Sequence, residues 1–230
     1  MWTAAHDPAV TDITSLAARR PRATLAVMAV LGVAASLYFG RPVVDRQDLN
    51  PTPALLAIID DPASPRVGPA DADVTILVFT DYQCPICRAT DPPLERLAAA
   101  DRKVRIIFKD WPIFGANSTL AARAALAADR QGKYLSLHRA LMTTRLPITA
   151  ATLKPIAVAA GVDWPRLETD LRVHLSEIDL TLAGHAGQAR SLGLQGTPGY
   201  VVGSTLVRGG LDGHALARAV ADTRKARGVS

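Results

Sequence analysis

Uncharged apolar runs and polar breaks divide this chain, and the longest such run is Ala23–Gly40, which reads ATLAVMAVLGVAASLYFG. At about 1.5 Å per residue, a helix of this length spans roughly 27 Å, close to the hydrocarbon thickness of a bilayer. Arginines precede the run, and Arg41 follows it. The pattern predicts a transmembrane signal-anchor, with residues 1–22 in the cytoplasm and the remainder on the far side of the membrane.

Two other interpretations of this run stay open. A cleaved signal peptide needs small residues at the cleavage site, and Val33-Ala34-Ala35 would serve. The region before the run is long, however, and Leu37–Phe39 extend the run past that site. The third interpretation is a buried helix of a soluble protein.

Two later apolar runs predict neighbouring strands. Val74–Thr80 is β-branched and apolar almost throughout, which is typical of a strand covered on both faces. Apolar residues recur at helical spacing in Arg88–Ala100, and Val104–Phe108 is a second apolar run. A strand, a helix and a strand in this order predict a right-handed parallel unit.

The second half of the chain begins with helical patterns. Asn117–Met142 is rich in alanine and leucine, and Gly132 is a candidate break within it. Further helices are expected at Thr149–Ala160, Asp163–Glu177 and Ile178–Leu192. The chain then predicts a β-hairpin and a last helix capped by Asp212, in the ranges Tyr200–Val202, Thr205–Val207 and His214–Arg224.

Proline dominates the segment before the first strand. Six prolines between Arg41 and Pro69 exclude a long helix there. We therefore expect 41–69 to be a stalk or linker that becomes structure near its end, with a short helix in Ala54–Ile59.

Composition narrows the chemistry. The net charge is +5, and the lysines and arginines are spread without a block of five like charges, so a nucleic-acid site is not indicated. Five histidines are scattered, and the only cysteines are Cys84 and Cys87. One C-x-x-C pair supplies two ligands, whereas zinc and iron–sulfur sites need four. We therefore expect no metal and no cofactor other than a redox-active Cys84–Cys87 disulfide.

The cysteines follow the predicted strand at once and open the predicted helix, in the order Cys84-Pro85-Ile86-Cys87. Disulfide exchange needs one thiolate that attacks and a second thiol that resolves the mixed disulfide. A helix N-terminus lowers a thiol pKa from ~8.5 into the range ~3.5–7.5. Pro85 falls in the first turn, where proline is favoured. We expect Cys84 to be the exposed attacking nucleophile and Cys87 the more buried resolving thiol.

A second candidate site lies far along the chain. Thr197-Pro198 follows a glycine and precedes the predicted hairpin, so Pro198 is a candidate for a cis peptide bond.

The chain resembles the DsbA-type thioredoxin-fold oxidoreductases over Leu55–Ala221. The resemblance rests on four segments in matching order: FTDYQCPIC, KDWPIFG, AARAALAADRQGKYLSLHRALM and GTPGYVVGSTLVRGGLDG. It implies an α/β thioredoxin-like fold with an inserted all-helical domain. It also implies a cis-proline loop at Thr197 and Pro198 that pairs with the backbone of an unfolded client protein, and thiol–disulfide exchange in the periplasm.

The resemblance and the apolar pattern together divide the chain into seven parts. The first three are a cytoplasmic tail, the signal-anchor and the stalk, at 1–22, 23–40 and 41–69. The thioredoxin fold is expected at 70–115 and 193–226, on either side of the helical domain at 116–192. Residues 227–230 form a short tail.

Two positions depart from the family pattern. Many relatives have an acid six residues before the first cysteine, and Val78 stands there in this chain. Asp81 lies in the following loop, so we do not assign that role to it, and we expect proton transfer at Cys87 to use water. Strongly oxidising members often have a histidine between the cysteines, where this chain has Ile86. Isoleucine cannot donate to a thiolate, so we expect a less lowered pKa and a less oxidising disulfide than in those members.

The leading hypothesis is an oxidase of exported proteins, anchored in the bacterial inner membrane and recharged by a quinone-linked membrane oxidant. A reductase or isomerase that a membrane donor keeps reduced is the first alternative. Residues 41–73 are too short and proline-rich for a dimerisation domain, which counts against the usual dimeric isomerase. The second alternative is a non-catalytic thiol- or metal-binding protein. Trp111, Ile113 and Phe114 either line an apolar client groove or pack in the core.

Overall fold

The computed structural model describes residues 45–228. The predicted signal-anchor and cytoplasmic tail lie outside these residues. Among the helices in the described range, none is both long and apolar enough to cross a bilayer.

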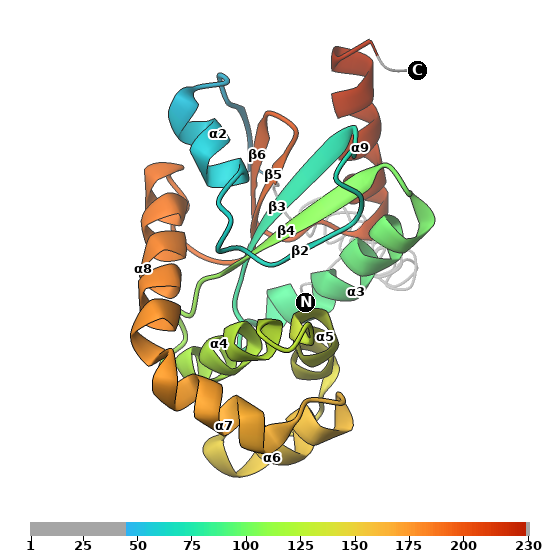
Figure 1. Cartoon of the computed structure of the whole chain (residues 1–230). Helices are drawn as coiled ribbons and strands as arrows, with labels where there is room; N and C mark the ends of the chain where they lie inside the picture. The colour runs from blue at the N-terminus through green and yellow to red at the C-terminus, as the bar shows by residue number, and fades with distance from the viewer. Residues whose placement is uncertain (1–44, 229–230) are drawn as a thin grey trace, which may run out of the picture. The chain divides into compact units, whose positions relative to one another are not determined.

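One six-stranded sheet organises residues 45–228, with the strand order β1-β6-β5-β3-β4-β2 (Figure 1). Strand β3 runs parallel to β4 and β5 pairs antiparallel with β6, as the predicted parallel unit and hairpin require, and β3 also pairs antiparallel with β5. The strands are β1 (Asp45–Asp48), β2 (Arg66–Val67), β3 (Val74–Thr80), β4 (Val104–Asp110), β5 (Gly199–Val202) and β6 (Thr205–Arg208).

The proline-rich segment corrects one expectation. From Asp45 onward it is not a free stalk, because β1 pairs with β6 and β2 pairs with β4 at the two edges of the sheet. The expected short helix is present as α2 (Pro53–Ile59), capped by the Thr52 side chain. Prolines exclude a long helix but are tolerated beside short edge strands, so proline content alone could not distinguish a stalk from sheet edges.

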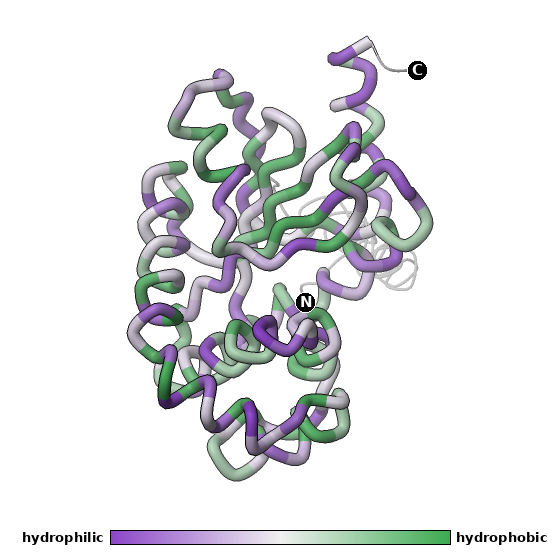
Figure 2. Tube along the Cα trace, viewed as in Figure 1, coloured by the Kyte–Doolittle hydropathy of each residue, from purple (hydrophilic) through white to green (hydrophobic). Residues whose placement is uncertain are grey.

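Helices cover both faces of the sheet. The face that includes Ile76, Val78 and Ile106 packs in one cluster with α3 (Pro85–Ala100) and α9 (Gly213–Ala226). The opposite face packs against α2 and α8 (Leu175–Ser191). Figure 2 shows apolar colour along the central strands, which agrees with burial on both faces. The sheet therefore holds the end of β3, where the cysteines follow, in a rigid frame.

Five helices fill the expected insertion between β4 and β5. They are α4 (Ala116–Asp129), α5 (Tyr134–Thr143), α6 (Ala150–Ala159), α7 (Trp164–Val173) and α8. The break at Gly132 is confirmed, and this glycine has a φ of 66°. The break between α7 and α8 falls at His174 rather than after Glu177. The sequence did not indicate this break, because no glycine or proline stands near His174 to mark the end of a helix.

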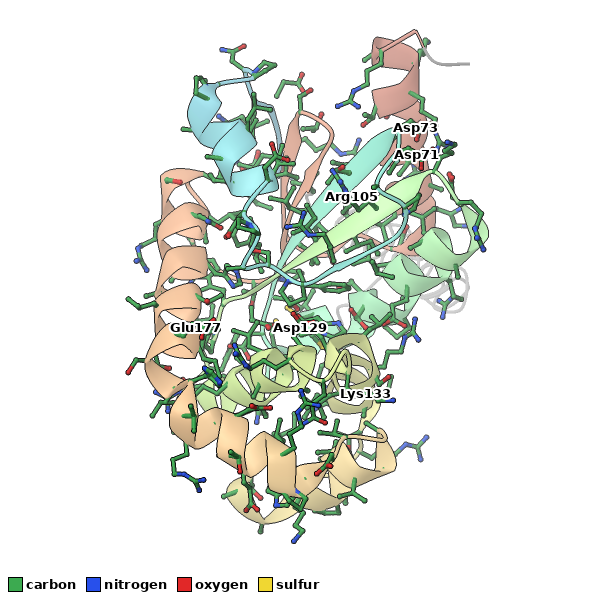
Figure 3. The ribbon with its side chains drawn as sticks, in the orientation of Figure 1. Asp71, Asp73, Arg105, Asp129, Lys133 and Glu177 are labelled. Carbon is green, nitrogen blue, oxygen red and sulfur yellow. The ribbon has the colours of Figure 1, made fainter. Side chains whose placement is uncertain are left out.

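The far end of the sheet, where β3 begins, is closed by an ion cluster. The Arg224 guanidinium of α9 lies 2.8 Å from Asp73 and 2.7 Å from Asp101. Figure 3 labels Asp73 at this end, beside Asp71. The charged residues near the C-terminus of α9 therefore include a fixed structural contact.

A buried histidine fixes α8 to the rest of the domain. His185 is fully buried, with Nε2 3.0 Å from Ser64 Oγ and Nδ1 3.2 Å from the carbonyl oxygen of Asp110. Burial and the nearby charge of Lys109 lower the pKa of His185 from 6.5 to about 4. The imidazole is therefore neutral in the folded protein at neutral pH.

We expect the cost of His185→Asn to depend on pH. A histidine whose pKa is lower in the folded state contributes stability above its unfolded pKa, and that stability is lost as the pH falls towards the folded pKa. The variant should therefore lose about 2–3 kcal/mol less stability near pH 4.5 than near pH 7. Urea unfolding at both pH values measures this, with exposed His214→Asn as the control. An equal loss at both pH values would contradict a neutral buried His185.

Candidate active site

The dithiol lies where β3 ends and α3 begins. Cys84 is the N-cap of α3, and its Sγ accepts a hydrogen bond from the Cys87 N–H at 3.4 Å. Pro85 is the first residue of the helix, where its missing N–H leaves no donor unpaired. The predicted placement of the cysteine pair at a helix start is confirmed.

Cys84 is more enclosed than the sequence suggested, whereas Cys87 is buried as expected. Cys84 was expected to be exposed, but only 2 % of its surface is accessible, against 1 % for Cys87. The cover comes from a distant segment, because the carbonyl oxygen of Thr197 lies 3.3 Å from Cys84 Sγ. Cys87 faces the apolar cluster that contains Val78.

The two thiols have opposite shifts in pKa. The Cys87 thiol has the largest effect on the pKa of Cys84, and the Cys87 and Ile86 amides add to it. Against the cost of burial, these donors lower the pKa of Cys84 from 9.0 to about 6. Burial raises the pKa of Cys87 far above its ordinary value. At neutral pH the reduced pair is therefore a Cys84 thiolate beside a protonated Cys87.

The second predicted site faces the first. The Thr197–Pro198 peptide bond is cis, as the sequence suggested. Thr197 contacts Cys84 through its carbonyl oxygen, although the two residues are 113 positions apart. The structure thus brings Cys84, Cys87, Thr197 and Pro198 into one site at the end of β3 and the start of β5.

Asp81 organises the loops around the site. Its buried carboxylate accepts hydrogen bonds from the Gln83 amide at 2.7 Å, the Ile113 amide at 2.6 Å, the Phe114 amide at 3.1 Å and the Ser118 hydroxyl at 2.7 Å. Gln83 belongs to the dithiol loop, and the other three donors lie at the end of the β4–α4 loop and the start of α4. The carboxylate therefore joins the dithiol loop to this segment. Asp81 holds the dithiol loop in place through these hydrogen bonds.

Exposed apolar side chains flank this arrangement. Ile113 and Phe114 are 41 % and 52 % exposed, whereas Trp111 is buried in the core. Ile86 and Leu146 are also large, apolar and exposed. Of the three residues expected either in a client groove or in the core, Trp111 is therefore a core residue. Ile113 and Phe114 are exposed instead.

Sequence reasoning missed a buried polar chain behind the dithiol. The Tyr82 hydroxyl lies 3.0 Å from His138 Nδ1, and His138 Nε2 lies 2.9 Å from Asp91. Tyr134 joins the other end and donates to Asp110, whose pKa burial raises to about 6. These residues come from α3, β4, α5 and the dithiol loop, so the chain ties the helical insertion to the site. No short motif marks it, because its members are scattered in sequence.

One cluster offers atoms that could ligate a cation. Ligand atoms of Asp91, Glu95 and His138 lie within 4.8 Å of one another. His138 already hydrogen-bonds to Asp91, and Glu95 pairs with Arg139 at 2.5 Å. Because His138 is bonded to Asp91 and Glu95 to Arg139, we assign the cluster to the contact between α3 and α5, although Glu95 Oε1 has no hydrogen-bond partner there.

Comparison with known proteins places this site in a family. Residues 75–221 match the model of the DSBA-like thioredoxin domain. A thioredoxin-like oxidoreductase from Silicibacter pomeroyi is 38 % identical with a TM-score of 0.69, and the match covers 74 % of this chain and 96 % of that one. A periplasmic thioredoxin-like protein from Salmonella enterica serovar Typhimurium is 32 % identical with a TM-score of 0.64, covering 76 % and 98 %.

A curated relative shows the domain in another setting. The Na(+)/H(+) antiporter NhaA 1 of Mycolicibacterium gilvum is 30 % identical over 169 residues, which are 72 % of this chain and 27 % of the antiporter. The chain thus spans about a quarter of the length of that relative. The family match covers the dithiol, the helical insertion and the cis-proline loop. The chain therefore belongs to the family of DSBA-like thioredoxin domains.

Proposed function

We propose that this protein is a membrane-anchored periplasmic dithiol oxidase, in which Cys84 and Cys87 carry the disulfide passed to exported proteins. The observation that carries the proposal is the place of Cys84 at the start of α3, where the Cys87 thiol and amide lower the pKa of Cys84 to about 6. A stabilised thiolate favours the reduced form of the pair, and a disulfide whose reduced form is favoured is a strong oxidant.

The reaction proceeds in two exchanges. A client thiolate attacks Cys84 Sγ of the disulfide, and Cys87 leaves as a thiolate that takes up a proton because its pKa is raised. The second client thiolate attacks the client sulfur of the mixed disulfide, and Cys84 leaves as a stable thiolate. Two electrons pass from the client dithiol to the protein. Of the two client protons, Cys87 keeps one and the other goes to solvent.

The surroundings of the site suit an extended, unfolded client. A cavity of about 640 Å³ borders the cis-proline loop and includes Gly196, Thr197 and Pro198 in its wall. Backbone groups of such a loop pair with an extended chain as an added strand does. The exposed apolar residues Ile113 and Phe114 supply contacts for client side chains.

Two observations support the proposed location. The uncharged run at 23–40 precedes the domain, and arginines before it favour a cytoplasmic N-terminus. A solved protein similar to this chain is periplasmic. A stretch of 169 residues similar to this chain also occurs within an antiporter, the Na(+)/H(+) antiporter NhaA 1. Regeneration of the disulfide requires a two-electron acceptor, and we assign this task to a membrane protein linked to quinone.

One experiment tests direction and anchoring together. Spheroplasts that make the full chain, in a host without its own dithiol oxidase, are pelleted and washed before a reduced soluble client is added. We expect the pellet to oxidise the client and the supernatant to be inactive. Net reduction of an oxidised client by the pellet would support the reductase alternative and overturn the oxidase. Activity found only in the supernatant would contradict the anchor.

A further inference from the structure

A polar contact links β5 to the second turn of α3. The Tyr200 hydroxyl donates to Thr90 Oγ1 at 2.9 Å. Tyr200 stands opposite Val78 in the register of β5 and β3, so its ring lies on the sheet face that packs under α3. The ring is buried, and burial raises the pKa of its hydroxyl, which therefore remains a donor.

Thr90 passes this contact to the peptide between the cysteines. Its Oγ1 donates to the Ile86 carbonyl oxygen at 2.9 Å, one helical turn earlier, and lies 3.3 Å from the Cys87 carbonyl oxygen. The Ile86 carbonyl and the Cys87 N–H belong to the same peptide unit. That N–H donates to Cys84 Sγ. A continuous chain of hydrogen bonds therefore runs from Tyr200 through Thr90 and one peptide unit to the attacking sulfur.

Donation to a peptide oxygen polarises the peptide and makes its N–H a stronger donor, and successive bonds strengthen one another by roughly 10–30 % each. The backbone also packs closely against Thr90. A Cβ added at Gly210 would lie 2.8 Å from Ile86 Cγ2 and 3.0 Å from Thr90 Cγ2, so the glycine backbone packs directly against both side chains. This packing holds the methyl side of Thr90 in place.

We propose that Thr90 and Tyr200 are positioning residues that strengthen the hydrogen bond from the Cys87 amide to the Cys84 thiolate. They influence the reactivity of Cys84 through this chain of hydrogen bonds, without contacting the sulfur or the client. The role rests on thiol–disulfide exchange at Cys84 and not on the proposed oxidising direction. It is tested by titrating Cys84, which does not depend on that direction.

The test titrates the thiolate of the reduced full chain by its ultraviolet absorbance in four variants. Thr90→Val keeps the shape and removes the hydroxyl, and should raise the apparent pKa of Cys84 by about 0.5–1 unit, a three- to tenfold change in the ionisation constant. Thr90→Ser should restore the wild-type value, and Tyr200→Phe should shift it in the same direction by less. Thr181→Val is the matched control, because Thr181 makes the same bond to the carbonyl four residues earlier, in α8.

The outcomes distinguish an effect of Thr90 on the ionisation of Cys84 from an effect on the stability of the fold. A merely structural Thr90 would lower the unfolding midpoint of Thr90→Val and leave the Cys84 titration unchanged, and this result would overturn the proposal. An equal shift in Thr90→Ser would also overturn it, since serine keeps the hydroxyl. Should Thr90→Val fail to fold, Tyr200→Phe carries the test, and an unshifted titration there overturns the proposal as well.

Discussion

Replacing Cys84 by serine is expected to abolish disulfide exchange, because Cys84 supplies the stabilised thiolate at the helix start. A serine hydroxyl does not ionise in the accessible pH range and forms no disulfide. The loss should exceed a thousandfold, as is usual when an attacking nucleophile is removed. The measurement is the rate at which the oxidised protein oxidises a dithiol peptide, and the rate at which the reduced protein reduces the disulfide form of that peptide.

The matched variant at Cys87 gives a different result from the same site. Cys87→Ser keeps the attacking thiolate but lacks the group that resolves the mixed disulfide, so client proteins should accumulate covalently on Cys84. Non-reducing gels and mass spectrometry identify these adducts. Full activity of Cys84→Ser, or adducts formed equally well by it, would reverse the assigned roles.

Replacing Asp81 by alanine is expected to cause the largest loss of stability among changes beside the site. The buried carboxylate satisfies three amides and the Ser118 hydroxyl, and alanine leaves all four donors without it. Each unsatisfied buried donor costs about 1–3 kcal/mol, so with partial relaxation we expect a total of about 3–5 kcal/mol. Urea unfolding of the reduced protein measures this directly.

Two companion variants show whether the loss belongs to this carboxylate. Asp81→Asn keeps one acceptor oxygen and should fall between alanine and wild type. Asp71→Ala removes an exposed acid paired with Lys103 and should leave the unfolding midpoint unchanged within error. If Asp81→Ala lost less than about 1 kcal/mol, the carboxylate would not be what holds the dithiol loop to the segment at Ile113.

Local pattern predicted the central part of the fold. The apolar runs at β3 and β4 and the hairpin of β5 and β6 are confirmed, because buried strands need long apolar stretches and tight turns. The edge strands were not predictable in this way. β2 has only two residues, and its conformation depends on pairing with β4 rather than on its own composition. The break between α7 and α8 likewise has no local signal.

For the site, too, local features were predictable and features that depend on distant segments were not. Spacing and position predicted Cys84, Cys87 and the cis Thr197–Pro198 bond. The burial of Cys84 was missed because its cover comes from a loop 113 residues away. The expectation for Ile86 considered only its side chain, whereas its backbone amide contributes to lowering the pKa of Cys84. Backbone donors and long-range cover are properties of the folded chain, so residue identity alone does not reveal them.

The reduction potential of the Cys84–Cys87 pair tests the oxidase most directly. The full chain is equilibrated in glutathione buffers of graded ratio, and the fraction of disulfide is measured after acid quenching. The stabilised Cys84 thiolate predicts a potential near or above roughly −150 mV, with the reduced form more stable than the oxidised form. A potential near roughly −270 mV would contradict it, because the pair would then act as a reductant.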